Sequence, residues 1–288
     1  MSPAPFLSIV TISYNQAAYL REAIASVVSQ KADDVEYIVV DPGSTDGSRE
    51  IIAGFGAQID HVVLDPDDGP ADGLNKGFAR ARGRIGYFLN ADDFLLPHAI
   101  DALRRLWREN GDLDFLLCRA WMIDGQGRAI RELIPTPIRT AHLKFGAATI
   151  AQQGVSFTLD LFRAVGGFNP ANRSCWDYEL FCQFTRRGAR FRTAPDRIAA
   201  FRLYDGSITG GGMGDAHQAR FDADFRRVHE AILGQADTPP RIKLLRAGRW
   251  YKMIANPAHA LHRMREHLLP WITQARWRAD LEGTAPRA

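Results

Sequence analysis

The sequence has few cysteines and no long apolar run, and these absences narrow the class of protein before any motif is considered. Its three cysteines, Cys118, Cys175 and Cys182, form no CxxC pair, so a disulfide framework is excluded and we expect reduced, buried thiols. No run approaches the ~18 apolar residues of a membrane span, and no basic segment precedes an apolar stretch at the start. We therefore expect a cytoplasmic protein, soluble or peripheral on the inner face of a membrane.

Several binding motifs are absent as well. The sequence has neither the GxxxxGKS/T pattern of a P-loop nor the GxGxxG pattern of a dinucleotide-binding turn. His61, His98 and His142 lie far apart without the spacing of zinc ligands, so we interpret them as structural or surface residues. Disorder is excluded, because 46% hydrophobic and 10% aromatic residues in a chain of 288 supply a sizeable core.

The first hundred residues alternate between two periodicities. Short β-branched runs are followed by segments of helical spacing, which is the pattern of βαβ units with right-handed crossovers. We predict an α/β fold with a Rossmann-like, mostly parallel sheet flanked by helices. The predicted strands are Phe6–Ser13, Val35–Val40, Ile59–Leu64 and Ile85–Leu89, and the predicted helices are Ala17–Gln30, Asp46–Phe55 and Ala71–Arg82.

Acidic and amide side chains follow the predicted strands, at the sheet edge where ligands of such folds bind. Carboxylates gathered there repel one another, so their clustering favours a bound cation, although any one of them could be a helix N-cap. The doubled Asp92-Asp93 offers oxygen ligands that suit Mg²⁺ or Mn²⁺ bridging a diphosphate. The residues that follow the strands are Tyr14, Asn15, Asp41, Asp65, Asp67, Asp68, Asn90, Asp92 and Asp93.

Three ordered motifs and three later segments carry a family resemblance over roughly the first 210 residues. They are Ser8–Asn15, Val39–Ser48, Gly83–Asp93, Gly166–Asn169, Trp176–Leu180 and Phe201–Thr209. With these segments the sequence resembles glycosyltransferase family 2. The resemblance implies a GT-A fold, a divalent metal, and an inverting transfer from a nucleotide-diphospho-sugar, typically UDP-linked, to a saccharide or lipid-linked acceptor.

The resemblance assigns roles at the donor to individual positions. Thr11 and Tyr14 would line the nucleotide pocket, and Asp41 would accept a hydrogen bond from the base, typically uracil. Asn90 stands where the family has the first acid of its DxD motif; it departs from a carboxylate, and an amide there can still contact a ribose or phosphate.

The resemblance also implies a metal site and a donor-side loop. Asp92 is the expected metal ligand, and Asp93 is its neighbour in the same shell. The stretch Asp68–Gly77 resembles a donor-side loop of bacterial members. The candidate contacts in this loop are Asp72, Asn75 and Lys76.

The catalytic base follows from the late acidic motif. Asp177 matches the base of the family, with helix N-capping as the alternative role. Because Asp177 and Glu179 are two residues apart, a helix cannot direct both at one site, and we interpret Glu179 as a solvated helix residue. Asp205 stands where the family often has His, and so departs from the family pattern at a position of metal or phosphate contact. Together with Asn90 it leaves open a non-catalytic nucleotide-sugar-binding or scaffolding protein.

We predict two domains. Residues 1–212 would form the GT-A catalytic domain, with a nucleotide-sugar half at about 1–115 and an acceptor half at about 116–212, and residues 213–288 would form a basic helical C-terminal extension. A sugar nucleotidyltransferase is disfavoured, because Ser13–Gln16 lacks a Gly-rich phosphate loop with a basic residue.

The basic tail suggests a partner of its own. From Arg241 onward ten Lys and Arg stand against three acids, a net +7 that leaves −4 for the rest of the chain. The basic residues thus lie away from the acidic strand ends, which disfavours nucleic-acid binding. Basic amphipathic helices with Trp can instead lie on an anionic membrane, although packing on the catalytic domain or on a partner subunit is the alternative. The features are the mixed basic and apolar segment Arg241–Ile254, the helix start Asn256-Pro257, the stripe Leu261, Met264 and Leu268, and a break at Pro270 before Trp271.

Overall fold

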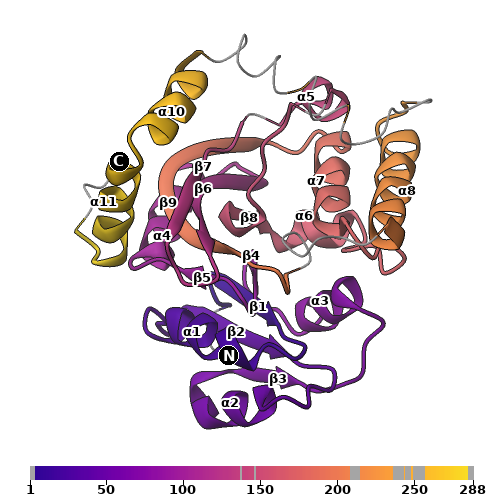
Figure 1. The fold of residues 1–288 in the computed structure, drawn as a ribbon. Coiled ribbons are helices and arrows are strands. Elements are labelled where there is room, and N and C mark those ends of the chain that lie inside the picture. Colours follow the sequence, from indigo (N-terminus) through magenta and orange to yellow (C-terminus); the bar gives the residue numbers. More distant parts are fainter. Residues whose placement is uncertain are drawn as a thin grey trace.

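A single sheet organises the molecule, flanked by helices on both faces (Figure 1). The computed structural model describes residues 4–136, 138–145, 147–207, 215–235 and 257–284, together with positions 243 and 248. Within them the sheet has nine strands in the order β3-β2-β1-β4-β8-β6-β9-β5, with β7 paired to β6. The predicted α/β class is confirmed. The rest of the segment 241–254 and the expected cap at 256 lie outside the described residues.

The first four strands are parallel, as the alternating pattern predicts. β2 pairs with β1 and β3, and β1 pairs with β4, all in parallel register. Every residue of β2 is buried, because both faces of this part of the sheet are covered. The elements are β1 (Leu7–Ile12), α1 (Ala17–Val28), β2 (Val35–Val40), α2 (Ser48–Phe55), β3 (His61–Val63), α3 (Pro70–Phe78) and β4 (Ile85–Asn90).

The side chains of each strand alternate between two cores. In β1, Leu7 and Ile9 join the core beneath α1 and α4 (Ala99–Glu109), and Val10 joins the opposite core. That second core includes residues of α3, α6 (Leu159–Ala164) and α7 (Trp176–Arg186). The alternation fixes the register, because a slip of one residue would exchange the two sets.

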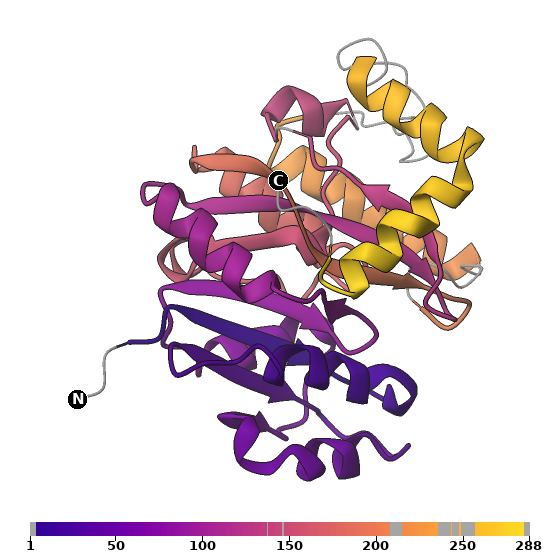
Figure 2. The same ribbon diagram turned by 90° about the vertical axis from the view of Figure 1, so that its left-hand side faces the viewer.

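The second half of the sheet is mixed. β8 (Val155–Thr158) runs antiparallel to both β4 and β6 (Phe115–Asp124), whereas the long β9 (Phe191–Leu203) runs parallel to β6. The sheet curls as it passes through β6 and β9 (Figures 1 and 2). The remaining elements are β5 (Phe94–Leu95), β7 (Ala129–Leu133), the short helix α5 (Thr140–Lys144), the 3₁₀ turn η2 (Gln152–Gly154), the 3₁₀ turn η1 (Gly56–Gln58) and α8 (Asp215–Ala231).

The last two helices are attached to the sheet. α10 (Pro257–Leu268) ends just before Pro270, which begins α11 (Pro270–Leu281), so the predicted break is confirmed. Trp277 of α11 is 3% exposed and packs against Trp121 of β6 and Phe94 of β5. α11 is therefore part of a small third core. Within the described ranges, no helix combines the length and the apolar character that crossing a membrane requires.

A buried carboxylate on β7 anchors these helices electrostatically. Both oxygens of Glu132 are occupied: Arg119 and Arg197 contact Oε1 at 3.1 and 2.8 Å, and Arg276 of α11 contacts Oε2 at 3.0 Å. His262 of α10 lies 3.3 Å from Oε2. Burial alone would raise the pKa of Glu132, but the contact with His262 and the three guanidinium charges hold it well below its ordinary value. One carboxylate thus joins β6, β7, β9, α10 and α11.

Attachment through His262 predicts a pH dependence of stability. The carboxylates of Glu132 and Glu266, 3.3 and 3.5 Å from Nε2, raise the pKa of His262 from 6.5 to about 9. Its stabilising contribution is full below the unfolded pKa and is lost as the pH rises through the folded pKa. We expect the free energy of unfolding to fall between about pH 6.5 and pH 9, and the fall to shrink in His262→Gln. Urea unfolding at the two pH values measures this, and identical slopes in both proteins would contradict the assignment.

Candidate active site

A pocket of about 1530 Å³ opens at the carboxyl ends of the parallel strands. Residues that follow β1, β2 and β4 form one side of it, among them Tyr14, Gly43 and Asn90. The start of α7 supplies Asp177, and α10 reaches the pocket with Arg263. The sheet edge predicted from the sequence is therefore a pocket wall, and α10 contributes to the same pocket.

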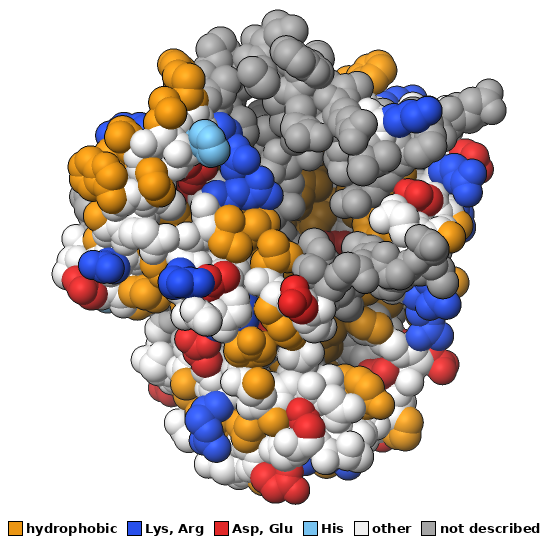
Figure 3. Space-filling view, in the orientation of Figure 1, with side chains coloured by type: hydrophobic (Ala, Val, Ile, Leu, Met, Phe, Trp, Pro, Cys, Tyr) orange, Lys and Arg blue, Asp and Glu red, His pale blue; other side chains and the backbone are white. Residues whose placement is uncertain are grey.

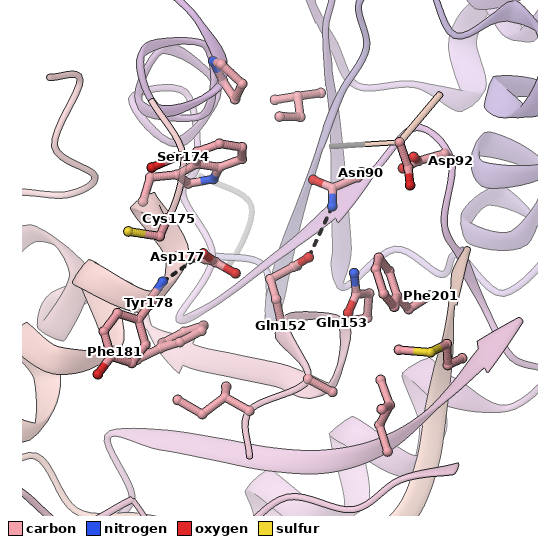
Figure 4. A pocket seen from close by; sticks show the side chains of 18 of the residues that line it. Asn90, Asp92, Gln152, Gln153, Ser174, Cys175, Asp177, Tyr178, Phe181 and Phe201 are labelled. Carbon is pink, nitrogen blue, oxygen red and sulfur yellow. Dashed lines mark hydrogen bonds between the residues drawn. The ribbon is translucent and has the colours of Figure 1, made fainter. Parts of the chain in front are cut away.

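Asp92 and Asn90 border the pocket at the end of β4. Figure 4 shows Asp92, Asn90 and Gln152 along one side of the pocket and Asp177 across from them. Burial raises the pKa of Asp92 above its ordinary value. The Nδ2 of Asn90 donates to Gln152 and to Asp93, each at 3.2 Å, so its oxygen is the atom available toward the pocket. The two side chains thus offer oxygen ligands side by side.

Asp93 faces the interior and does not border the pocket. Its carboxylate is 1% exposed and accepts hydrogen bonds from the Arg202 backbone N–H at 2.9 Å, from Gln153 at 2.8 Å and from Asn90. Burial, together with the charge of Asp92, raises the pKa of Asp93 well above its ordinary value. Arg202 also donates to the carbonyl oxygen of Asp92 at 3.0 Å. Asp93 therefore joins β9 and η2 to the turn that presents Asp92.

Asp41, the acid predicted to bind the nucleotide base, directly follows β2. Asp41 is fully buried, and its Oδ1 accepts from the backbone N–H of Gly43 and Ser44 and from Arg49. Its Oδ2 is buried without a hydrogen-bond partner among the described residues. A buried acceptor left in this state costs free energy; Asp41 itself does not border the pocket, whereas the adjacent Pro42 and Gly43 do.

Thr11 and Tyr14, both predicted to line the nucleotide pocket, occupy different places. Thr11 is fully buried within the sheet and accepts a hydrogen bond from the Tyr37 hydroxyl at 3.0 Å. Tyr14, directly after β1, is 62% exposed and borders the pocket. Of these two residues only Tyr14 borders the pocket.

The donor-side loop approaches the pocket through its first residues. Asp67 and Gly69 border the pocket, whereas Asp72 and Lys76 lie outside its lining. Lys76 contacts Asp72 one helical turn away at 2.7 Å and donates to the carbonyl oxygen of Pro66. The pair holds the loop onto α3. Asn75, the third predicted contact of this loop, donates to the carbonyl oxygen of Phe168 and accepts from its N–H.

Asp177 lies in the first turn of α7 and borders the pocket. The N-cap position belongs to Cys175, whose side chain makes no capping hydrogen bond. Asp177 Oδ1 accepts from the backbone N–H of Tyr178 at 2.8 Å. The helix start therefore orients a carboxylate toward the pocket instead of using it as the cap.

The interpretation of Glu179 as a solvated residue is wrong. Its side chain is buried and accepts hydrogen bonds from Asn169 and Asn172 and a pair from Arg227 of α8 at 3.0 and 2.8 Å. Burial raises its pKa, but these hydrogen bonds, that of Arg227 foremost, outweigh burial and hold the pKa below its ordinary value. Glu179 thus ties α7 to α8, and a pattern of one sequence cannot reveal a partner almost fifty residues away.

Sequence reasoning also missed the glutamines of η2. Gln152 donates to the carbonyl oxygen of Phe88 at 2.9 Å and accepts from Asn90, and Gln153 donates to Asp93. η2 lies so close to β6 that a Cβ on Gly154 would collide with the carbonyl oxygen of Cys118. The only signal in the sequence is two glutamines and a glycine ahead of an apolar strand.

A second group of possible metal ligands lies at Glu132, His262 and Glu266. One ligand atom from each lies within 4.8 Å of the others. Three guanidinium groups already contact Glu132, and protonated His262 adds a further positive charge. This cluster is therefore electrostatically unfavourable for a cation, and the oxygen ligands of Asp92 and Asn90 suit one better.

Solved structures share this fold. S. aureus TarS residues 1–349 in complex with UDP-GlcNAc superposes with a TM-score of 0.64 at 17% identity, over 83% of this chain and 70% of that one. The mannosyltransferase PcManGT of Pyrobaculum calidifontis, in complex with GDP-Man and Mn²⁺, superposes with a TM-score of 0.58 at 18% identity, over 98% and 86%. The architecture is that of GT-A glycosyltransferases.

Sequence comparison assigns the family. Residues 8–209 match the model of glycosyl transferase family 2, so the chain belongs to this family. A glycosyltransferase of Nostoc sp., uncharacterized by name, is 26% identical over 209 residues, which cover 69% of this chain and 65% of that protein. The chondroitin synthase of Pasteurella multocida is 25% identical over 187 residues, 64% of this chain and 19% of that protein. The chain thus matches only part of the length of each relative.

The contrast between the adjacent acids predicts unequal effects on stability. In Asp93→Asn an amide N–H₂ faces buried donors in either orientation, so we expect a loss of ~1–3 kcal/mol in the free energy of unfolding. In Asp92→Asn we expect a change within ~0.5 kcal/mol, since this side chain borders the pocket, where water can hydrate an amide as well as a carboxylate. Urea unfolding at neutral pH measures both; equal losses would contradict the inward orientation of Asp93.

Proposed function

We propose that the protein is an inverting glycosyltransferase that moves a sugar from a UDP-linked donor to a hydroxyl of a saccharide or lipid-linked acceptor. The observation that carries the proposal is the pair of carboxylates, Asp92 and Asp177, across one pocket at the strand ends. Inversion requires the leaving group and the attacking hydroxyl to lie on opposite sides of the anomeric carbon. Membership of the family and the nucleotide sugars bound to TarS and PcManGT support this choice.

The nucleotide is assigned to the ends of β1 and β2. The ring of Tyr14 offers a surface on which a base can stack, and Asp41 Oδ2 is a buried acceptor for the imide N–H of uracil. Asp72 and Lys76 support this end by holding the loop from which Asp67 and Gly69 reach the pocket. Thr11 acts from within the sheet through its hydrogen bond with Tyr37.

The diphosphate is assigned to the end of β4. The carboxylate of Asp92 and the amide oxygen of Asn90 are hard ligands of the kind that Mn²⁺ and Mg²⁺ prefer, and PcManGT was solved with Mn²⁺. A divalent cation held there supplies positive charge to the diphosphate as it departs. Asp93 supports the ligands from the interior, since it fixes the turn through Arg202 and Gln153.

Asp177 is assigned as the general base. The bond between the anomeric carbon and the phosphate oxygen breaks, the acceptor oxygen bonds to that carbon, and the hydroxyl proton passes to the Asp177 carboxylate. Its position in the first turn of α7 favours the ionised form needed to accept a proton, because the positive end of the helix dipole lies there.

Substitution of the proposed base tests the mechanism. We expect Asp177→Asn to lower turnover by ~10²–10⁴ while donor affinity stays nearly constant, because a base acts in the transition state. Steady-state kinetics with a nucleotide sugar and a verified acceptor measure turnover, and calorimetry measures affinity. Full turnover in the variant would remove Asp177 from the mechanism.

Substitution of the proposed metal ligand tests the donor site. In the wild type we expect UDP and Mn²⁺ each to tighten binding of the other, and in Asp92→Asn we expect this coupling to be lost while the fold remains. Calorimetric titration of UDP with and without Mn²⁺ measures the coupling. Unchanged coupling in the variant would overturn the assignment, and coupling without turnover on any donor would favour the non-catalytic alternative.

We further propose that α10 contacts an anionic membrane. The apolar side chains of Leu261, Met264, Leu268 and Trp271 are 54–67% exposed at intervals of three and four residues, so they share one side of the helix and its junction with α11. Hydrophobic side chains gather at the upper left of Figure 3, over this helix. The exposed Arg265 lies beside them, and such a surface combines apolar insertion with attraction to anionic lipids.

Point variants test membrane contact better than truncation, because α11 carries the buried Trp277. We expect the full chain to co-sediment with vesicles of phosphatidylglycerol and phosphatidylcholine at low salt and to be released at high salt. Leu268→Asp should lose this binding. Val62→Asp, a matched change at an exposed apolar residue of β3, should retain it. Equal sedimentation of both variants, or no sedimentation of the wild type, would refute the proposal.

A further inference from the structure

The wall of the pocket formed by β7 and α10 is basic. Arg131 of β7 and Arg263 and His267 of α10 border the pocket here, and none of them belongs to the donor residues described above. Figure 3 shows Lys or Arg side chains and a His side chain gathered below α10, beside the central hollow of the molecule. We call Arg131, Arg263 and His267 the basic wall.

Arg131 has no carboxylate partner among the described residues. Its guanidinium is largely buried, and its Nε is fully enclosed without a hydrogen-bond partner. Burial and the neighbouring charge of Arg263 lower the pKa of Arg131. Two like charges are thus held near each other where water is scarce, an arrangement that is unfavourable until an anion lies between them.

The nearby acids do not supply that anion. Glu132 also borders the pocket, but Arg119, Arg197 and Arg276 contact its carboxylate. Glu266 raises the pKa of Arg131, yet it also lies 3.5 Å from His262 and 3.6 Å from Arg263. Around the basic wall the cationic groups therefore outnumber the carboxylates, and Arg131 is the one whose charge is least compensated.

The basic wall lies apart from the residues that are assigned to the donor. The donor residues follow β1, β2 and β4, whereas the wall comes from β7 and from the C-terminal helix α10. A volume of about 1530 Å³ also exceeds the ~300–1,000 Å³ of a pocket for one small ligand. Donor and acceptor can therefore occupy the pocket together, with the acceptor beside the wall.

We propose that the basic wall is an acceptor subsite that binds an anionic group of the acceptor, a phosphate or a carboxylate. The inference rests on the proposed glycosyl transfer. Arg131 and Arg263 grip the anion with planar guanidinium groups, which form paired hydrogen bonds with either kind of anion. Met264, on the same helix, borders the pocket and is also more than half exposed, so α10 stands between the bound anion and the apolar surface described above.

Matched acceptor analogues test the subsite. Ligand-observed NMR on the full chain, with UDP and the diamagnetic Mg²⁺ in excess to occupy the donor site, compares glycerol 3-phosphate with glycerol and methyl glucuronide with methyl glucoside. We expect one or both anionic analogues to bind and the neutral ones to bind at least tenfold more weakly; the two pairs distinguish a phosphate from a carboxylate site. Equal binding of charged and neutral analogues would overturn the proposal.

Variants assign the binding to the basic wall. Arg131→Gln and Arg263→Gln should each weaken binding of the anionic analogue about tenfold or more. Arg278→Gln, which removes the same charge from an exposed α11 residue outside the pocket lining, should bind as the wild type does. Wild-type affinity in both wall variants would refute the subsite. A matching loss of UDP affinity in Arg131→Gln would assign the arginines to the donor and also refute it.

A separate measurement keeps the two proposals apart. Hydrolysis of UDP-sugars by the wild-type protein, with water in place of the acceptor, reports on the proposed transfer reaction alone. Anion binding that depends on Arg131 and Arg263 without any hydrolysis would support the subsite and count against the enzyme activity. Hydrolysis without such anion binding would do the reverse.

Discussion

The buried carboxylate of Asp93 is the constraint on which the candidate active site depends. It accepts hydrogen bonds from three parts of the chain that are far apart in sequence, at Asn90, Gln153 and Arg202. A charge in this position is unfavourable without such partners, so strand β4, turn η2 and strand β9 must meet around it. Because they do, Asp92 and the oxygen of Asn90 are directed outward to the pocket. Asp93, which does not border the pocket, thereby orients Asp92 and Asn90, the residues assigned to hold the metal.

Glu132 has the same role for the C-terminal helices. Its four cationic contacts join the sheet to α10 and α11, and removal of one partner from such a buried cluster would leave the others uncompensated. α10, which belongs to the basic C-terminal extension, thus completes a wall of the pocket. Two buried carboxylates, Asp93 after β4 and Glu132 on β7, thus hold together elements that border the pocket.

Features carried by local patterns could be predicted from the sequence, and those that depend on distant contacts could not. Alternating strand and helix periods gave the order of β1 to β4 with their helices, and the strand ends brought Tyr14, Asn90 and Asp92 to one pocket as expected. The orientation of Asp93 was not predictable, because its partner Arg202 is 109 residues away. The local sequence predicts a surface position for Glu179, because its partner Arg227 belongs to another helix. The residues of the basic wall carry no motif at all.

The close approach of η2 to β6 requires that position 154 carry no side chain. Only a residue without a side chain allows the turn to rest against the carbonyl group of Cys118. A single methyl group there would push the turn toward the pocket or away from the strand and shift Gln152 and Gln153 from Asn90 and Asp93. The alignment of the oxygen ligands therefore depends in part on the absence of a Cβ at position 154, which does not itself border the pocket.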